Sequence, residues 1–233
     1  MLKRAVAAGG VTSPDCSMAG ATLGLAVRPR LEWRDDERMP ERRSNADALS
    51  VEDWQGLGLD YGTVGLAVAR PEWRQLAERL ANVIRDTLGA STASVEHIGS
   101  SAVPGLAAKP ILDLAIGVAP HVPLEPLRHA LEDLGYQFRG DAGDQGGLVF
   151  VLEDRPKRRV VHLHVVDHDG PQWRRYLTFR DLLLTNADAR DRYERMKSDL
   201  AEKFPQDRKA YTAAKESLVR ALLEQHAAKR RQP

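Results

Sequence analysis

Cysteine is nearly absent from this sequence, because the 233 residues contain only Cys16. A single thiol cannot form a disulfide framework or a cysteine-rich zinc site within one chain, so both classes are excluded and a reducing compartment is indicated. Long apolar runs are also missing, and none approaches the ~20 residues that a membrane-spanning helix needs. Lys3 and Arg4 are not followed by the apolar core of a secretory signal. We therefore expect a cytoplasmic protein.

The sequence also lacks an excess of either charge, because it has 34 basic and 33 acidic residues and a formal net charge of +1. Such a balance gives no strong signal for a nucleic acid or a membrane surface as partner. The sequence is 42% hydrophobic and 29% charged, as expected of a globular protein. Its length fits one domain with extensions.

The first quarter of the chain lacks a steady apolar period. It mixes charges of both signs with small and turn-forming residues, and such a segment buries too little surface to offset its ordering entropy. We expect residues 1–62 to be a disordered N-terminal extension, 63–228 to be one folded domain, and 229–233 to be a flexible tail.

Strand and helix patterns alternate up to about residue 166, and helical patterns alone follow. The expected strands cover 63–69, 94–98, 111–118, 136–138, 148–154 and 159–166. We expect one helix from Pro71 to a cap at Gly89, one at 123–134, and three after Gly170. Strands first and helices last predict an α+β domain with a helical C-terminal half.

Two of these strands carry polar residues on one face only. Because side chains alternate along a strand, Asp113 shares a face with Ala115, and His162 shares a face with His164. The opposite faces are uniformly aliphatic. If the two strands pair, Asp113 and both histidines line one cleft.

Each of these polar residues also has a purely structural interpretation. An unpaired charge in an aliphatic strand costs several kcal/mol, so Asp113 needs a partner, which can be backbone or an arginine as well as a metal. His162 and His164 can hydrogen-bond across the sheet instead of binding a metal or contacting a phosphate.

Further candidates surround the turn "IGSSAVPG". Its backbone amides at Gly99 and the hydroxyls of Ser100 and Ser101 are a weak signal for a phosphate site. Lys109 is either a phosphate ligand or a solvated loop lysine. Arg180 lies near the buried stripe of its helix and therefore needs an anion, either a carboxylate or a substrate phosphate. We expect other charges of the helical half to be surface residues, namely Arg174, Arg175, Asp181, Lys197 and Lys215.

The segments "EHIGSSAVPGLAAKPILDLAIGV", "VVHLHVV", "WRRYLTFRDLLL" and "YERMKSDLAEKF", in this order, resemble the GrpB-like family over roughly residues 63–225. This resemblance implies a nucleotidyltransferase-like (polymerase-β-like) mixed sheet with helices on one side and a helical C-terminal part. The family is also found fused to dephospho-coenzyme A kinases. In this superfamily, the segment that follows the Gly-Ser turn contains Asp, a hydrophobic residue and a second acidic residue. Asp113 begins this part, but Ala115 stands where the second carboxylate is expected.

These residues and this resemblance are compatible with three functions. The first is a nucleotidyltransferase-like enzyme that binds a nucleotide or other phosphorylated ligand with a divalent metal, Mg²⁺ or Mn²⁺. Its expected phosphate site is Gly99, Ser100, Ser101 and Lys109, its metal ligands are Asp113, His162 and His164, and Arg180 joins these three in catalysis. The second is a catalytically degenerate nucleotide- or phosphate-binding module that assists a protein partner such as a coenzyme A biosynthesis kinase, and Ala115 favours it. The third is a metal-dependent hydrolase that uses the two histidines.

Overall fold

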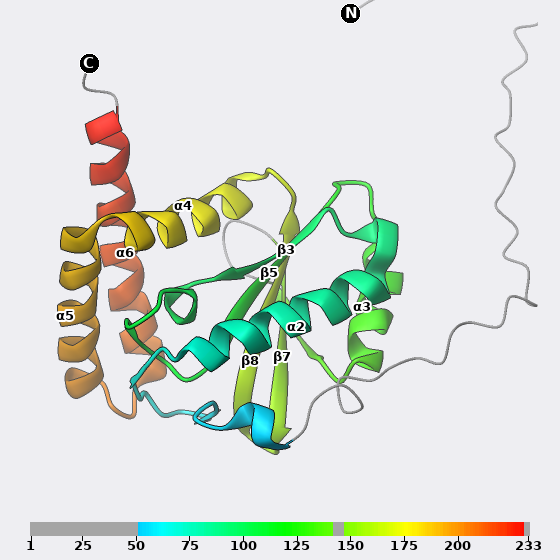
Figure 1. Cartoon of the computed structure of the whole chain (residues 1–233), viewed down its shortest axis with the longest axis horizontal. Helices are drawn as coiled ribbons and strands as arrows, with labels where there is room; N and C mark the ends of the chain where they lie inside the picture. Colours follow the sequence, from blue (N-terminus) through cyan, green and yellow to red (C-terminus); the bar gives the residue numbers. More distant parts are fainter. Residues whose placement is uncertain (1–50, 142–146, 231–233) are drawn as a thin grey trace, which may run out of the picture. The chain divides into compact units, whose positions relative to one another are not determined.

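In the computed structural model, the described residues are 51–141 and 147–230 (Figure 1). Cys16 and the expected extension up to residue 50 lie outside them. The elements in chain order are η1 (Val51–Trp54), β1 (Leu59–Asp60), β2 (Ala67–Val68), α2 (Pro71–Leu88), η2 (Gly89–Ser91), β3 (Ser94–Ile98), η3 (Ser100–Ala102), β4 (Ala107–Ala108), β5 (Leu112–Val118), α3 (Leu124–Asp133), β6 (Gln137–Asp141), β7 (Leu148–Arg155), β8 (Arg158–Asp167), α4 (Pro171–Thr185), α5 (Ala187–Lys203) and α6 (Arg208–Arg230).

The central sheet is mixed. Five strands lie in the order β3-β5-β8-β7-β6, and β1 pairs with β8. β5 and β8 run parallel, whereas the other pairs in the sheet are antiparallel. β2 and β4 form a separate two-stranded sheet. This arrangement is the α+β fold that the order of strand and helix patterns predicts.

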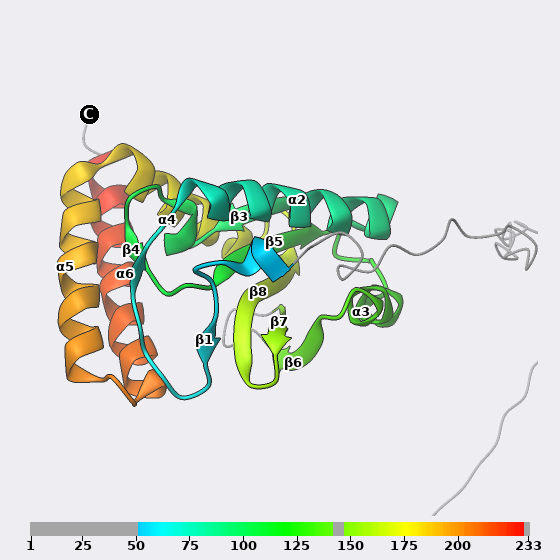
Figure 2. The same cartoon turned by 60° about the horizontal axis from the view of Figure 1, so that its bottom comes forward.

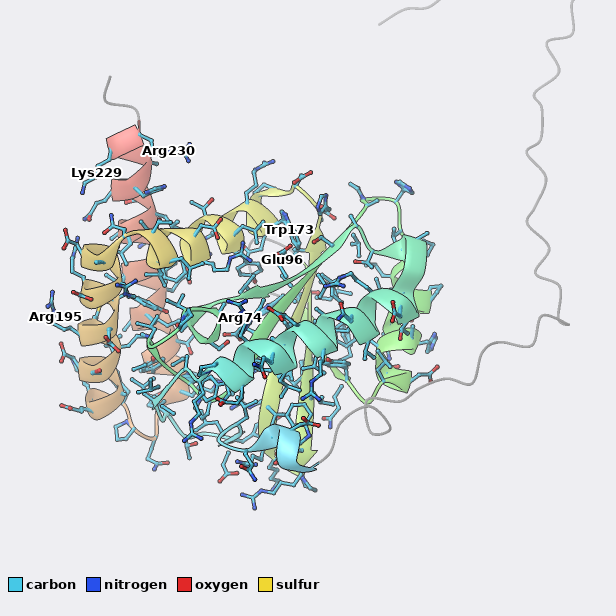
Figure 3. All side chains as sticks on the ribbon, in the orientation of Figure 1. Arg74, Glu96, Trp173, Arg195, Lys229 and Arg230 are labelled. Atoms are coloured by element: carbon cyan, nitrogen blue, oxygen red, sulfur yellow. The ribbon has the colours of Figure 1, made fainter. Side chains whose placement is uncertain are left out.

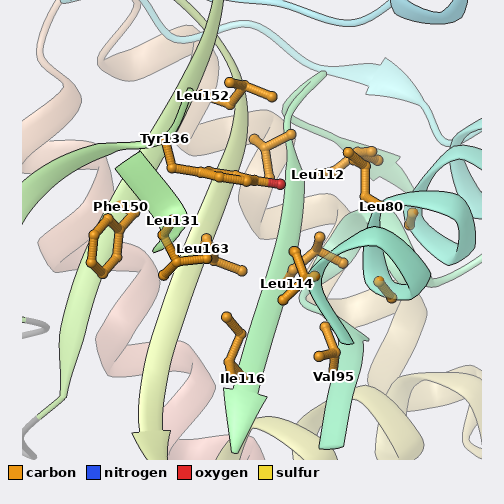
Figure 4. Close-up of a cluster of buried hydrophobic side chains, with 14 of the residues drawn as sticks. Leu80, Val95, Leu112, Leu114, Ile116, Leu131, Tyr136, Phe150, Leu152 and Leu163 are labelled. Atoms are coloured by element: carbon orange, nitrogen blue, oxygen red, sulfur yellow. The ribbon is translucent and has the colours of Figure 1, made fainter. Parts of the chain in front are cut away.

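One face of the central sheet is covered by α2 and α3 (Figure 1). α2 has Pro71 in its first turn, ends at Leu88 and is capped by Gly89, whose φ of 50° suits a residue without a Cβ. Leu114 of β5 and Leu163 of β8 are 0% exposed beneath these helices. Figure 4 shows how the aliphatic side chains of the strands meet those of the two helices. Burial of this apolar surface is the main stabilising term of the domain.

The opposite face carries the helical C-terminal part. Trp173 of α4 packs on Ile98 of β3, Ala115 of β5 and Val166 of β8. α5 and α6 lie side by side in both views of the chain (Figures 1 and 2). The three helices share a second apolar core that includes Phe179, Leu183, Tyr193, Leu218 and Leu222. These helices therefore enclose the polar face of β5 and β8.

Two boundaries of the folded domain differ from those expected from the sequence. Residues 51–62, which we assigned to a disordered extension, contain η1 and β1, and β1 pairs with β8. Leu57 in this segment is 1% exposed, so isolated apolar residues anchor it without any helical or strand period. At the other end, α6 continues to Arg230, beyond the expected start of the tail. No helix within 51–141 and 147–230 has the length and apolar character to cross a membrane.

Candidate functional site

The parallel pairing of β5 and β8 builds the polar site. In this register, Asp113 lies opposite His162 and Ala115 lies opposite His164. A cavity of about 270 Å³ opens over them, walled by α4, α5 and α6. Six of the residues selected from the sequence line it, namely Gly99, Ser100, Lys109, Asp113, His162 and His164. The predicted shared cleft is therefore present.

Asp113 is paired with a histidine and not with an arginine. Its Oδ1 lies 3.2 Å from Nδ1 of His162. Burial raises the pKa of the Asp113 carboxyl, but the hydrogen bond from His162, the charges that His162 and His164 carry when protonated at low pH, and the charge of Lys215 outweigh burial and bring this pKa to about 2. Burial lowers the pKa of His162. The pair thus consists of a carboxylate and a neutral imidazole, so Nδ1 of His162 donates the hydrogen bond.

His164 is engaged by α4. Its Nδ1 lies 3.2 Å from the hydroxyl of Tyr176, and the two rings are 5.2 Å apart between centroids. Burial lowers the pKa of His164 to about 4, so this ring is also neutral at physiological pH.

The turn after β3 approaches Asp113 closely. Gly99 has a φ of 69°, and a Cβ at this position would lie 2.7 Å from Oδ2 of Asp113. Only glycine allows both this backbone conformation and this contact. Oγ of Ser100 lies in the cavity wall, 3.1 Å from the hydroxyl of Tyr193 on α5.

Ser101 differs from its neighbour, because it does not line the cavity. This side chain is 4% exposed, and its Oγ accepts a hydrogen bond of 3.3 Å from the backbone N–H of Asp113. The same Oγ is 3.1 Å from Nε2 of His97. Ser101 thus ties the turn to β5.

Basic residues of α6 reach the cavity, although we expected Lys215 on the surface. Lys109, Arg208 and Lys215 all line it. Burial, followed by the charges of Lys215 and Arg208, lowers the pKa of Lys109 to about 7. The charge of Tyr193, followed by that of Asp113, raises the pKa of Lys215. Lys109 was selected from the sequence, but Arg208 and Lys215 were missed because each, taken alone in the sequence, resembles an ordinary surface charge.

Two more of the expected surface charges are also placed elsewhere. Arg175 lines the cavity and forms an ion pair with Glu216 of α6. Lys197 is 2% exposed, and its Nζ donates to the carbonyl of Ala107. A signal for Lys197 was available, because it follows Tyr193 by four residues and therefore lies on the same helix face.

Arg180 finds its anion outside the cavity. Its Nη1 lies 2.8 Å from Oε2 of Glu96, which Figure 3 labels on β3, and its Nε lies 2.8 Å from Oδ1 of Asp181. Nη1 also donates to the carbonyl of His97. Of the two alternatives for Arg180, the structure thus supplies a carboxylate, and Arg180 does not line the cavity.

The donor set does not fit a divalent metal centre. Among the described residues, no three His, Cys, Asp or Glu side chains are grouped to hold a metal ion. Ala115 is 0% exposed in an apolar cluster, so the position of the second carboxylate is filled by packing. The Nδ1 atoms of His162 and His164 are bonded to Asp113 and Tyr176, and the buried Nε2 of His162 has no hydrogen-bond partner among the described residues. These two imidazoles and one carboxylate do not form a ligand group for a metal ion. Two-metal phosphoryl transfer needs several clustered oxygen ligands, which these residues do not supply.

Comparison with known proteins identifies the family. The sequence profile described as "GrpB protein" matches residues 63–225. This chain belongs to the GrpB family. The glutamate-rich protein GrpB of Alkalihalophilus pseudofirmus is 31% identical over 72% of this chain and 98% of its own length. A UPF0157 protein of Pseudomonas aeruginosa is 38% identical over 75% of this chain and 72% of its own length.

Structural comparison agrees with this membership. The crystal structure of the conserved protein GrpB from Enterococcus faecalis matches with a TM-score of 0.61 at 29% identity, and the match covers 70% of this chain and 99% of that one. The GrpB fold seen here is consistent with a nucleotidyltransferase-like fold. A dephospho-CoA kinase of Mycolicibacterium paratuberculosis is 29% identical over 67% of this chain but only 44% of the kinase.

Proposed function

We propose that this GrpB-family protein binds a small phosphorylated ligand in the cavity over β5 and β8, without a resident divalent metal. One observation carries the proposal: Lys109, Arg208 and Lys215 converge on the cavity, and none of them has an ion-pair partner within the described residues. Arginine and lysine side chains are the usual protein ligands of phosphate groups.

The electrostatics of the cavity favour an anion. Asp113 is engaged by His162, and Glu216 is engaged by Arg175, so neither carboxylate forms an ion pair with Lys109, Arg208 or Lys215. The pKa of Lys109, lowered to about 7, reflects burial beside like charges. A phosphate group supplies negative charge to all three cations at once, which makes their burial favourable.

The size of the cavity favours a compact ligand. Its volume of about 270 Å³ lies below the usual range for sites that enclose drug-sized molecules, which begins at roughly 300 Å³. Tyr176, Phe179 and Tyr193 add aromatic surface to the walls. These features suit a phosphate monoester with a small organic part better than a nucleoside triphosphate with its metal ions.

A second candidate is assistance to a protein partner, such as a kinase of coenzyme A biosynthesis. The observation that favours it is the similarity to the dephospho-CoA kinase, which extends over 44% of that protein. In this function, binding of the phosphorylated ligand influences the partner, and the ligand undergoes no reaction in this protein. Both candidates use the same cavity, so ligand binding is the property to test first.

Titration calorimetry with propyl phosphate and adenosine 5′-monophosphate tests the proposal, with each titration done in EDTA and in Mg²⁺. We expect binding in EDTA and a loss of at least about tenfold in Lys215→Met, the effect of one charge-assisted contact. Lys229→Met is the matched control, because Lys229 is an exposed lysine near the end of the same helix (Figure 3). Binding that requires Mg²⁺, or that is unchanged in Lys215→Met, would contradict the proposal.

A further inference from the structure

Arg159 of β8 is a buried charge that the proposed phosphate site does not use. Only 2% of this residue is exposed. Its Nε and Nη2 are buried and have no hydrogen-bond partner among the described residues. A guanidinium taken out of water normally requires an anion, because desolvating a charge is costly.

The carboxylate opposite Arg159 in the sheet is already engaged. Glu153 lies opposite Arg159 in the β7–β8 pairing. However, the two Glu153 oxygens accept hydrogen bonds from Tyr61, Arg139 and the backbone N–H of Lys157. No ion pair joins Glu153 to Arg159 in the described part of the chain. The Tyr61 ring, 4.3 Å from the guanidinium carbon, covers one face of the arginine but cannot accept from its N–H groups as a carboxylate does.

The two unpartnered nitrogens form one edge of the guanidinium. Nε and Nη2 point their N–H groups in nearly the same direction, and this edge binds the two oxygens of a carboxylate side by side. If the two unpartnered N–H groups lay on different edges of the guanidinium, two separate water molecules would satisfy them as well as one anion. Two orphaned donors on the same edge match a single planar anion.

Arg159 does not itself line the cavity, but it lies on the same face of β8 as His162. The β7–β8 pairing is irregular at Leu152 and Glu153, and both Val160 and Val161 lie in the core under α2 and α3, so the alternation returns Arg159 to the face of His162. The charge of Arg159 lowers the pKa of Lys109 and of His162, and both of these residues line the cavity. In turn, burial and then the charge of Arg208 lower the pKa of Arg159. Arg159, Arg208 and Lys109 therefore act on one another, and among the described residues no carboxylate forms an ion pair with any of these three cations.

We infer that Arg159 is a second anion-binding subsite, and that the ligand of this cavity carries a carboxylate in addition to its phosphate group. The inference rests on the proposed function, because the phosphate group would occupy the neighbouring cations. Since both nitrogens are closed to solvent, the carboxylate reaches them only when covering side chains move. Tyr61, which is 39% exposed and stacks on the guanidinium, is one such side chain.

Thermal unfolding without ligand gives the first test. An arginine that awaits an anion destabilises the free protein, so Arg159→Met should raise the melting temperature, whereas an arginine with a structural role would lower it. Arg159→Gln, which keeps a polar side chain without the charge, should not fall below the wild type. A lower melting temperature in both variants would overturn the inference.

Titration with a matched ligand pair gives the second test. 3-Phosphoglycerate carries a phosphate and a carboxylate, whereas glycerol 3-phosphate carries the phosphate alone. We expect the wild type to bind 3-phosphoglycerate at least about tenfold more tightly, and Arg159→Met to abolish this preference while changing the glycerol 3-phosphate affinity less than about threefold. Equal affinities in the wild type, or equal losses for both ligands in Arg159→Met, would overturn the inference alone. If neither ligand binds, the proposed function fails and the inference fails with it.

Discussion

The two faces of the central sheet are formed by the same strands, but different interactions determine what each face contributes. On one face, Leu114 and Leu163 are fully buried under α2 and α3 among many interchangeable apolar neighbours. On the other face, Asp113 and His162 form one specific pair. The aliphatic face stabilises the domain through its area, whereas the polar face depends on which groups meet. Substitutions on the aliphatic face should therefore cost much more stability than substitutions on the polar face.

The largest expected effect is on the aliphatic face. Leu163→Ala should lower the free energy of unfolding by about 2–5 kcal/mol, because it leaves a void in a fully buried position. His164→Gln, at the next position but on the cavity face, should cost about 1 kcal/mol or less. Urea denaturation of both variants measures the difference. Equal losses would show that the two faces are not energetically distinct.

The next effect tests the missing carboxylate. Ala115→Asp places an acidic side chain among Ile98, Val166 and Trp173, so it should lower stability by about 3 kcal/mol and create no Mg²⁺ site. Ala115→Ser is the milder control, since its hydroxyl is neutral. Thermal unfolding with and without Mg²⁺ makes the measurement. If Ala115→Asp were stable and further stabilised by Mg²⁺, the metal-dependent function would again be favoured.

The pH dependence of ligand binding should report on Lys109. In the free protein its pKa is lowered to about 7, and a bound phosphate raises this pKa toward the ordinary value of 10.5. Binding therefore takes up a proton above pH 7, and the affinity should fall with rising pH by up to about tenfold per pH unit. The phosphate itself stays doubly ionised in this range, since its second pKa is about 6.

Calorimetry at pH 7.0 and 8.5, in buffers of different ionisation heat, measures both the affinity and the proton uptake. In Lys109→Met the affinity at pH 7.0 should be lower and the pH profile flat. A wild-type affinity that does not change between these pH values would rule out a phosphate contact by Lys109.

The smallest effect concerns Arg180. Because its partners Glu96 and Asp181 lie outside the cavity, Arg180→Met should lower stability by about 1 kcal/mol and leave phosphate affinity unchanged. Lys215→Met should do the reverse, with reduced affinity and nearly unchanged stability. A loss of affinity in Arg180→Met that matches Lys215→Met would restore the ligand role that we first considered for Arg180.

Much of the site was predictable because strand periodicity is local. The alternation in 111–118 and 159–166 placed Asp113, His162 and His164 on one face, and the observed register confirms this. A phosphate-binding role for this cleft stays a prediction, whereas the described donor set does not fit the metal role that we expected for these residues. The start of the folded part was placed too late, because Leu57 is anchored by tertiary contacts and belongs to no periodic pattern.

By itself, the sequence determined the strand faces, the helical C-terminal half and the family resemblance, since each is read from neighbouring residues. Only the tertiary structure decided which charges meet. Lys109 and Lys215 are far apart in the chain, Arg180 is neutralised by Glu96, and Arg159 is buried with no carboxylate partner in the part of the chain that the structure describes. The reason is physical: periodicity follows from local backbone geometry, whereas a charge acquires its partners and its dielectric surroundings only when distant segments pack together.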